Sequence, residues 1–147
     1  MTTGVFLDSG IFIAFLVRAD ALHRQAVSLF SRPPAAWLTS VLVLAETYGW
    51  FLHRAGEEAA RQFRALVGEL PGLELVGTDE RHHAAVGRKL DAFRGARLTY
   101  VDASSLVWLA ERKVDTVWGT DHHLALEGAR VIPGPPAPRG GRRAGAR

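Results

Sequence analysis

The sequence predicts an α/β protein, a three-layer α/β/α sandwich with a central parallel sheet. Short apolar segments that suit buried strands alternate with longer segments whose apolar residues recur at the spacing of a helix. Parallel strands need long crossover connections, and the helices in those connections cover both faces of the sheet. Ligands of such sheets bind beyond the carboxyl ends of the strands, so the residues after each strand are the first candidates for a site.

The N-terminal part of the chain begins this alternation. Residues 4–7 form a short apolar strand that ends at Asp8, and Ser9 is a candidate N-cap for the apolar helix that follows. Asp20 is a candidate N-cap for an amphipathic helix, which a pair of prolines stops.

The rest of the chain continues the pattern. Ser40 is expected to cap a helix over residues 41–52, and Gly56 to open a helix that Pro71 ends. Asp79 is a candidate cap for the next helix. The other elements expected are strands over residues 37–39, 73–76, 115–119 and 130–132, a helix over 103–112 and a short helix over 122–127.

Composition indicates one globular domain with a basic tail. Of the 147 residues, 48% are hydrophobic and 22% are charged, which excludes a disordered or collagen-like chain. The net charge is +3, but residues 133–147 carry four arginines and no acid, and without those arginines the charge is −1. We therefore expect a folded domain over residues 1–132, followed by a disordered Pro/Gly/Arg-rich tail over residues 133–147.

The residue types that are absent narrow the possible sites. The chain has no cysteine, which excludes disulfides, thiolate zinc sites and cysteine nucleophiles. Any metal site must therefore use oxygen or imidazole ligands. No apolar run is long enough to span a membrane, and the N-terminus lacks the positive charge of a signal peptide. We expect a soluble cytoplasmic protein without membrane contacts.

Four acidic residues stand in apolar surroundings where a carboxylate is costly. They are Asp8 after the first strand, Glu46 within the apolar helix over residues 41–52, Asp102 before an apolar helix and Asp121 after a strand. A buried carboxylate without a partner is strongly destabilising, so each needs compensation. The three aspartates can also act as helix caps or arginine partners. A mid-helix glutamate caps nothing, and its main alternative is a buried arginine.

Four oxygen donors without a cysteine match a hard cation, Mg²⁺ or Mn²⁺, rather than zinc. Four negative charges in one cleft repel one another, and divalent cations relieve that repulsion. Such a cluster suits phosphodiester chemistry, because the cation can activate water and hold the scissile phosphate.

At these residues the sequence resembles the PIN-domain family, and within it the VapC-type ribonuclease toxins of toxin–antitoxin pairs. The order, the spacing and the total length all agree, and the resemblance covers about residues 3–132. The matching pieces are a strand followed by Asp8-Ser9, Thr39-Ser40 with Glu46 on the next helix, the segment from Leu98 to Ala103 around Asp102, and Thr120-Asp121 after a strand.

The resemblance implies a parallel sheet flanked by helices, an Mg²⁺- or Mn²⁺-dependent endoribonuclease acting on RNA, a homodimer and a protein antitoxin. It also implies site residues. Asp8, Glu46, Asp102 and Asp121 are expected to form the catalytic, metal-binding set, and Ser9 and Thr120 to support it by hydrogen bonds. Bulky Trp118 and the arginine tail depart from the commoner pattern of the family.

Two other functions remain as alternatives. A non-catalytic module with this fold would bind RNA or protein without cleaving it. Another Mg²⁺-dependent phosphohydrolase of the haloacid-dehalogenase kind would need a second aspartate two residues after Asp8, where the chain has Gly10. A phosphate-binding Walker loop is absent from the sequence.

The histidines have ordinary structural interpretations. His122 and His123 directly follow Asp121, and they are interpreted as the opening of a short helix, with a phosphate contact as the alternative. His82 and His83 lie among charged residues and are expected on the surface.

Overall fold

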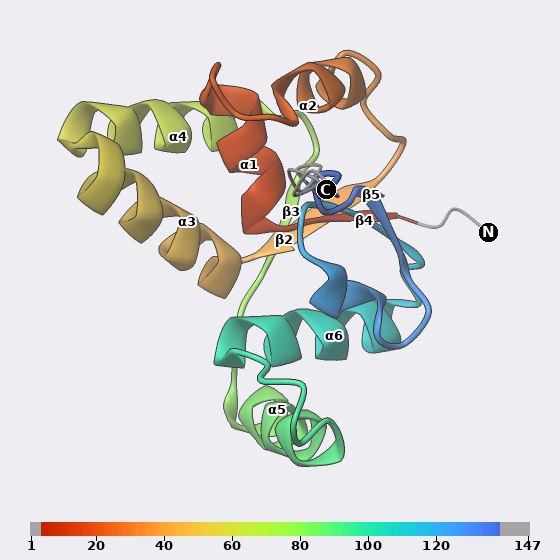
Figure 1. Cartoon of the computed structure of the whole chain (residues 1–147). Coiled ribbons are helices and arrows are strands. Elements are labelled where there is room, and N and C mark those ends of the chain that lie inside the picture. The colour runs from red at the N-terminus through yellow and green to blue at the C-terminus, as the bar shows by residue number, and fades with distance from the viewer. Residues whose placement is uncertain (1–3, 139–147) are drawn as a thin grey trace, which may run out of the picture.

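The computed structural model describes residues 4–138, and five parallel strands form its central sheet (Figure 1). The strand order is β3-β2-β1-β4-β5, and every neighbouring pair is parallel. The sheet confirms the predicted strand–helix alternation. The strands are β1 (Val5–Leu7), β2 (Trp37–Ser40), β3 (Glu74–Val76), β4 (Thr116–Gly119) and β5 (Arg130–Pro133).

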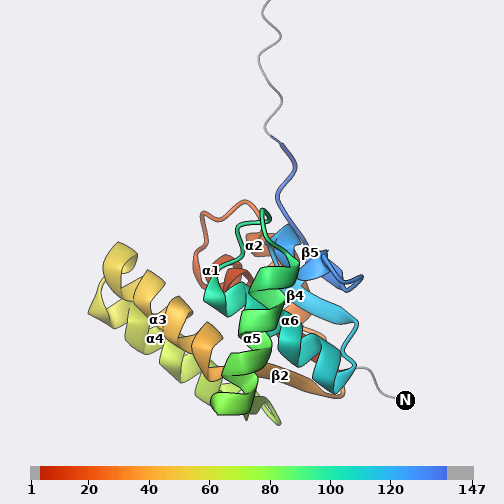
Figure 2. The ribbon, with the colours of Figure 1, turned by 90° about the horizontal axis from the view of Figure 1, so that it is seen from below.

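Helices cover both faces of the sheet, as predicted for three layers. Helices α1 to α4 lie on one face, and α5 and α6 lie on the other (Figure 1). Figure 2, viewed from below, shows α5 and α6 in front of the strands. The helices are α1 (Ser9–Leu16), α2 (His23–Phe30), α3 (Val41–Ala55), α4 (Glu57–Glu69), α5 (Glu80–Ala92) and α6 (Tyr100–Arg112), with a 3₁₀ helix η1 (His122–Ala125).

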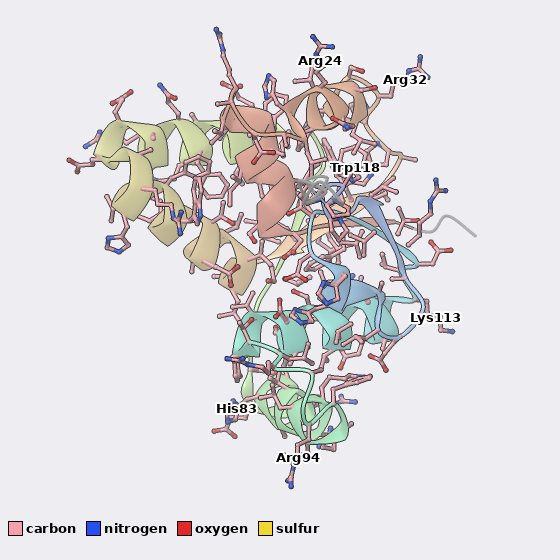
Figure 3. The ribbon with its side chains drawn as sticks, in the orientation of Figure 1. Arg24, Arg32, His83, Arg94, Lys113 and Trp118 are labelled. Atoms are coloured by element: carbon pink, nitrogen blue, oxygen red, sulfur yellow. The ribbon has the colours of Figure 1, made fainter. Side chains whose placement is uncertain are left out.

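Aromatic packing joins α1 to α4 and holds α2 against the sheet. Phe12 on α1 is fully buried and meets Phe63 of α4 edge-to-face, with ring centroids 5.3 Å apart. Trp118 lies on β4, where Phe30 of α2 and Trp37 of β2 pack against it edge-to-face at 5.4 and 6.0 Å (Figure 3). Trp118 is 4% exposed, so this departure from the family pattern is a core residue.

Several local expectations are confirmed by hydrogen bonds. The Ser40 hydroxyl accepts a bond from the Val43 backbone N–H, and the Asp79 carboxylate accepts one from His82 N–H, so both cap their helices. Gly56, with a φ of 93°, both ends α3 and opens α4. None of the helices in residues 4–138 is long and apolar enough to cross a membrane.

Other helix starts were predicted wrongly. Asp8, not Ser9, occupies the N-cap position of α1, and Ser9 is the first helical residue. Helix α2 begins only at His23, because the Asp20 carboxylate accepts a bond from Leu22 N–H and closes a turn before the helix. Helix α6 begins at Tyr100 rather than at residue 103.

The C-terminal elements also differ from their predicted bounds. The segment predicted as a short helix over residues 122–127 is the 3₁₀ helix η1, and the last strand continues through Pro133. The domain boundary placed after residue 132 stays a prediction, and the tail arginines at 139, 142, 143 and 147 lie outside the described residues.

His82 is buried, not at the surface as predicted. Its side chain is 4% exposed, stacks on Trp108 of α6 at 4.4 Å and places Nε2 2.7 Å from the Ser104 hydroxyl. Burial lowers the pKa of His82, so the neutral ring packs between α5 and α6. The charged neighbours in the sequence belong to the outer face of α5.

The sheet has its topological switch point between β1 and β4. The chain builds outward from β1 to β3 and then returns to place β4 on the other side of β1. Two glycines allow the segments after these strands to meet closely. A Cβ on Gly119 would lie 3.1 Å from the Asp8 Cβ, and one on Gly10 would overlap the Thr120 hydroxyl and lie 3.0 Å from its backbone nitrogen.

The Gly10→Ala variant is expected to lose about 1–3 kcal/mol of stability, because the added methyl group forces α1 away from Thr120. Gly68→Ala on α4 is the matched control. A Cβ there meets nothing within 4 Å, and removing a helical glycine stabilises by about 0.5–1 kcal/mol. Urea unfolding of both variants measures the difference, and equal effects of the two changes would contradict the close approach of β1 and β4.

Candidate metal centre at the carboxyl edge of the sheet

Asp8 directly follows β1 and lies beside the end of β4. Its backbone N–H donates to the Trp118 carbonyl at 2.9 Å, which extends the ladder between these two strands by one bond. The residue is 6% exposed, and its side chain does not cap α1. The carboxylate therefore enters the site directly from the end of the central strand.

Glu46 reaches the site from helix α3, on a different connection of the sheet. The Ser9 hydroxyl, in the first turn of α1, donates to Glu46 Oε1 at 3.1 Å. This bond ties α1 to α3 beside Asp8. Ser9 thus contacts one of the four carboxylates, and its supporting role in function stays a prediction.

Asp102 lies in the first turn of α6, where it belongs to a capping box. Its Oδ2 accepts a bond from Thr99 N–H, and the Thr99 hydroxyl accepts one from Asp102 N–H, both at 3.0 Å. The capping interpretation of Asp102 is therefore correct but incomplete. Only 13% of its side chain is exposed, and the same Oδ2 also lies close to a histidine of η1.

Asp121 follows β4 and serves as the N-cap of η1. Its Oδ1 accepts a bond from His123 N–H at 2.9 Å, and 41% of its side chain is exposed. Thr120, the preceding residue, packs against Gly10. No hydrogen bond of the Thr120 hydroxyl is found within residues 4–138, so its proposed supporting role stays a prediction.

Neighbouring carboxylates contribute to the raised pKa of two members of the set, Asp8 and Glu46. Burial raises the pKa of Asp8 to about 7, the Ser9 backbone N–H opposes the rise, and the charges of Glu46, Asp102 and Asp121 add to it. Burial also raises the pKa of Glu46, against the Ser9 hydroxyl and together with Asp102 and Asp121. Because the charges of the other three carboxylates all act on Asp8, the structure brings the four predicted residues close together.

Within residues 4–138, neither lysine nor arginine supplies a counter-charge to the four carboxylates. In the described part of the chain, no lysine or arginine forms an ion pair with any of the four carboxylates. Cationic side chains such as Arg24, Arg32, Arg94 and Lys113 instead project outward from the fold (Figure 3). Four carboxylates without a basic partner are oxygen donors of the kind that a divalent metal ion prefers.

His123 opens η1 as predicted, and it also lies at the site, beside two of the carboxylates. Its Nδ1 is 3.2 Å from Asp121 Oδ1 and 3.5 Å from Asp102 Oδ2. The angles do not satisfy a hydrogen bond, and this buried nitrogen has no hydrogen-bond partner. His122 Nδ1 is 3.6 Å from Asp121 Oδ1, with its side chain 73% exposed. The feature of the sequence that pointed to His122 and His123 is that they directly follow Asp121.

The chain belongs to the PIN-domain family, because the PIN domain model matches residues 5–125. Its fold is similar to that of the crystal structure of VapC20 from Mycobacterium tuberculosis, a toxin that cleaves the sarcin–ricin loop. The two structures superpose with a TM-score of 0.80 at 21% sequence identity, over 86% of this chain and 97% of the other. A search of curated protein sequences gives no significant match.

The Asp8→Asn variant is expected to be more stable than the wild type at pH 8 in EDTA. The folded state holds the Asp8 proton more tightly than the unfolded state, so its stabilisation is complete below about pH 4 and is lost as the pH rises to about 7. A rise of this size corresponds to a difference on the order of 4 kcal/mol. Asparagine removes this dependence.

Thermal unfolding at pH 5 and pH 8 measures the effect, with Asp91→Asn on the exposed side of α5 as the control. If Asp8→Asn had the same advantage at both pH values, burial of an ionising Asp8 would be contradicted. Added Mn²⁺ is expected to stabilise the wild type at pH 8 and to stabilise Asp8→Asn much less.

Proposed function

We propose that this protein is an endoribonuclease toxin that hydrolyses RNA phosphodiester bonds with Mg²⁺ or Mn²⁺. The observation that carries the proposal is the set of four carboxylates at the switch point of the sheet, without a lysine or arginine partner in the described residues. Membership of the PIN-domain family and the structural likeness to the toxin VapC20 support it.

In this proposal Asp8, Glu46, Asp102 and Asp121 hold one or two divalent cations. A bound cation would lower the pKa of water and neutralise charge that develops on the phosphate. Asp8 has a fixed position in the site because its backbone N–H is hydrogen-bonded to the neighbouring strand of the sheet. The Ser9 hydroxyl keeps Glu46 turned toward the other carboxylates, and the capping box holds Asp102 in place.

The proposed RNA substrate is consistent with an acidic site that binds cations and with a basic C-terminal tail. Without cations, an acidic cleft repels the phosphate backbone of RNA, so substrate binding depends on metal binding. The basic tail over residues 133–147 is proposed to add sequence-independent, salt-sensitive affinity. A nuclease of this kind needs restraint in the cell, and we propose a cognate protein antitoxin as the partner.

Cleavage of RNA oligonucleotides in Mn²⁺ or Mg²⁺ is the expected activity, and EDTA should abolish it. Asp121→Asn is expected to reduce the rate at least about 100-fold, because it removes a charged ligand while an amide still caps η1. Asp91→Asn serves as the control and should leave the rate unchanged. Gel analysis of labelled RNA, with circular dichroism to verify folding, gives the result.

Full activity of both Asp8→Asn and Asp121→Asn would refute the assigned roles. A wild-type protein that binds RNA tightly in Mn²⁺ but never cleaves it would favour the alternative of a non-catalytic binding module. Cleavage of small phosphomonoesters without cleavage of RNA would favour another phosphohydrolase.

The partner proposals have their own test. Light scattering is expected to give twice the monomer mass for the proposed homodimer, at any concentration well above its dissociation constant. Co-expression with the neighbouring short reading frame is expected to yield a stable complex with suppressed RNA cleavage. A monomer that remains active with every neighbouring gene product would contradict both expectations.

A further inference from the structure

We propose that His122 and His123 join Asp121 and Asp102 in a mixed nitrogen–oxygen cation site, which makes the centre prefer Mn²⁺ and Co²⁺ to Mg²⁺. The inference rests on the proposed metal centre and extends it, because the four-carboxylate set alone is a ligand set of oxygen atoms. It assigns these two histidines as ligands rather than as residues that merely open a helix.

The spacing of the donor atoms supports a common cation. His123 Nδ1 lies 3.2 Å from Asp121 Oδ1 and 3.5 Å from Asp102 Oδ2, and His122 Nδ1 lies 3.6 Å from Asp121 Oδ1. The ligand atoms of Asp121, His122 and His123 all lie within 4.8 Å of one another. Neighbouring ligands about 2.1 Å from an octahedral cation stand about 3.0 Å apart, close to the shortest of these separations.

The local fold holds these donors together. The bond from His123 N–H to Asp121 Oδ1 closes the turn that starts η1. The same turn brings the side chain of His123 back toward the carboxylate that caps it. The His122 and His123 rings lie side by side, with centroids 4.5 Å apart and planes tilted by 40°. Two consecutive histidines therefore present nitrogen atoms to one carboxylate.

The buried Nδ1 of His123 is the second observation. This atom is shielded from solvent and has no hydrogen-bond partner in the described structure, although two carboxylates lie nearby. A buried polar atom without a partner is destabilising. A cation bound between Nδ1 and the two carboxylates would satisfy all of them.

A counter-ion role for His123 is the main alternative, and the two roles predict opposite effects. A histidine that neutralises Asp102 and Asp121 competes with a metal, so removing it strengthens cation binding. A histidine that ligates the metal adds affinity, so removing it weakens cation binding. Imidazole suits Mn²⁺ and, more strongly, Co²⁺, whereas Mg²⁺ prefers oxygen ligands, so the loss should depend on the cation.

The experiment is calorimetric titration of the full-length protein with Mg²⁺, Mn²⁺ and Co²⁺ alone. His123→Ala is expected to weaken Co²⁺ binding at least tenfold, Mn²⁺ binding less and Mg²⁺ binding little. His122→Ala should give the same order with smaller losses, since its ring is more exposed. His53→Ala, an exposed histidine near the end of α3, is the matched control.

Nitrogen coupling in the pulsed electron paramagnetic resonance spectrum of the wild-type Mn²⁺ complex is an independent readout that needs no variant to fold. Its presence, with loss in His123→Ala, supports the proposal. Unchanged or stronger Co²⁺ binding in His123→Ala, or absence of nitrogen coupling, overturns it while leaving the four-carboxylate centre intact. Failure of the wild type to bind any of the three cations refutes the metal centre and this inference together.

Discussion

Burial of Asp8 among three other carboxylates is the constraint that the rest of this fold must offset. Asp8 follows the central strand, Glu46 lies on α3, Asp102 on α6 and Asp121 in the segment after β4, so every layer contributes to one cluster. Burial of the Asp8 carboxylate, and to a smaller degree its repulsion by the other three carboxylates, raises its pKa and opposes folding once the group ionises. The aromatic core and the ladder between β1 and β4 must offset that cost. The fold thus holds a destabilised site on a rigid base, which is typical of a site selected for binding rather than for stability.

The close approach of the segments that follow β1 and β4 determines how near Asp8 lies to Asp121. Gly119 gives space to the Asp8 side chain, and Gly10 gives space to Thr120. Side chains at either position would separate the ends of these strands and with them Asp8 from Asp121. The precision of the centre therefore depends on two residues that have no functional group at all.

Much of the fold follows from the sequence because its signals are local. Apolar periodicity and the caps at Ser40, Gly56 and Asp79 define elements through interactions within a few residues, and the structure confirms them. The errors at Ser9 and Asp20 arise because a polar residue before a helix can occupy more than one position of the turn. Asp102 was placed before its helix because Tyr100 and Val101, an aromatic and a β-branched residue, are not typical of a helix start, although Thr99 and Asp102 form the capping box around them.

Two histidines make contacts that local sequence patterns do not contain, although only the surface prediction for His82 is wrong. His82 is buried by packing of α5 on α6, and His123 reaches Asp102 only because η1 folds back over the start of α6. Both contacts join residues more than twenty positions apart in the chain, and neither has a periodic signature. The four acidic residues could be found from sequence because a lone charge in an apolar segment is unusual wherever its partners lie.

The position of Glu46 has a mechanical consequence. It is the one acidic residue of the four on the α3–α4 hairpin, and in the described structure its polar tie to the rest of the centre is the Ser9 hydroxyl. A cation shared by all four side chains would clip that hairpin to the sheet and close three long loops of chain at once, where the entropic gain from closure is large. The supply of divalent ions would then set how rigidly the α3–α4 hairpin is joined to the sheet, and removal of the ions would loosen the hairpin.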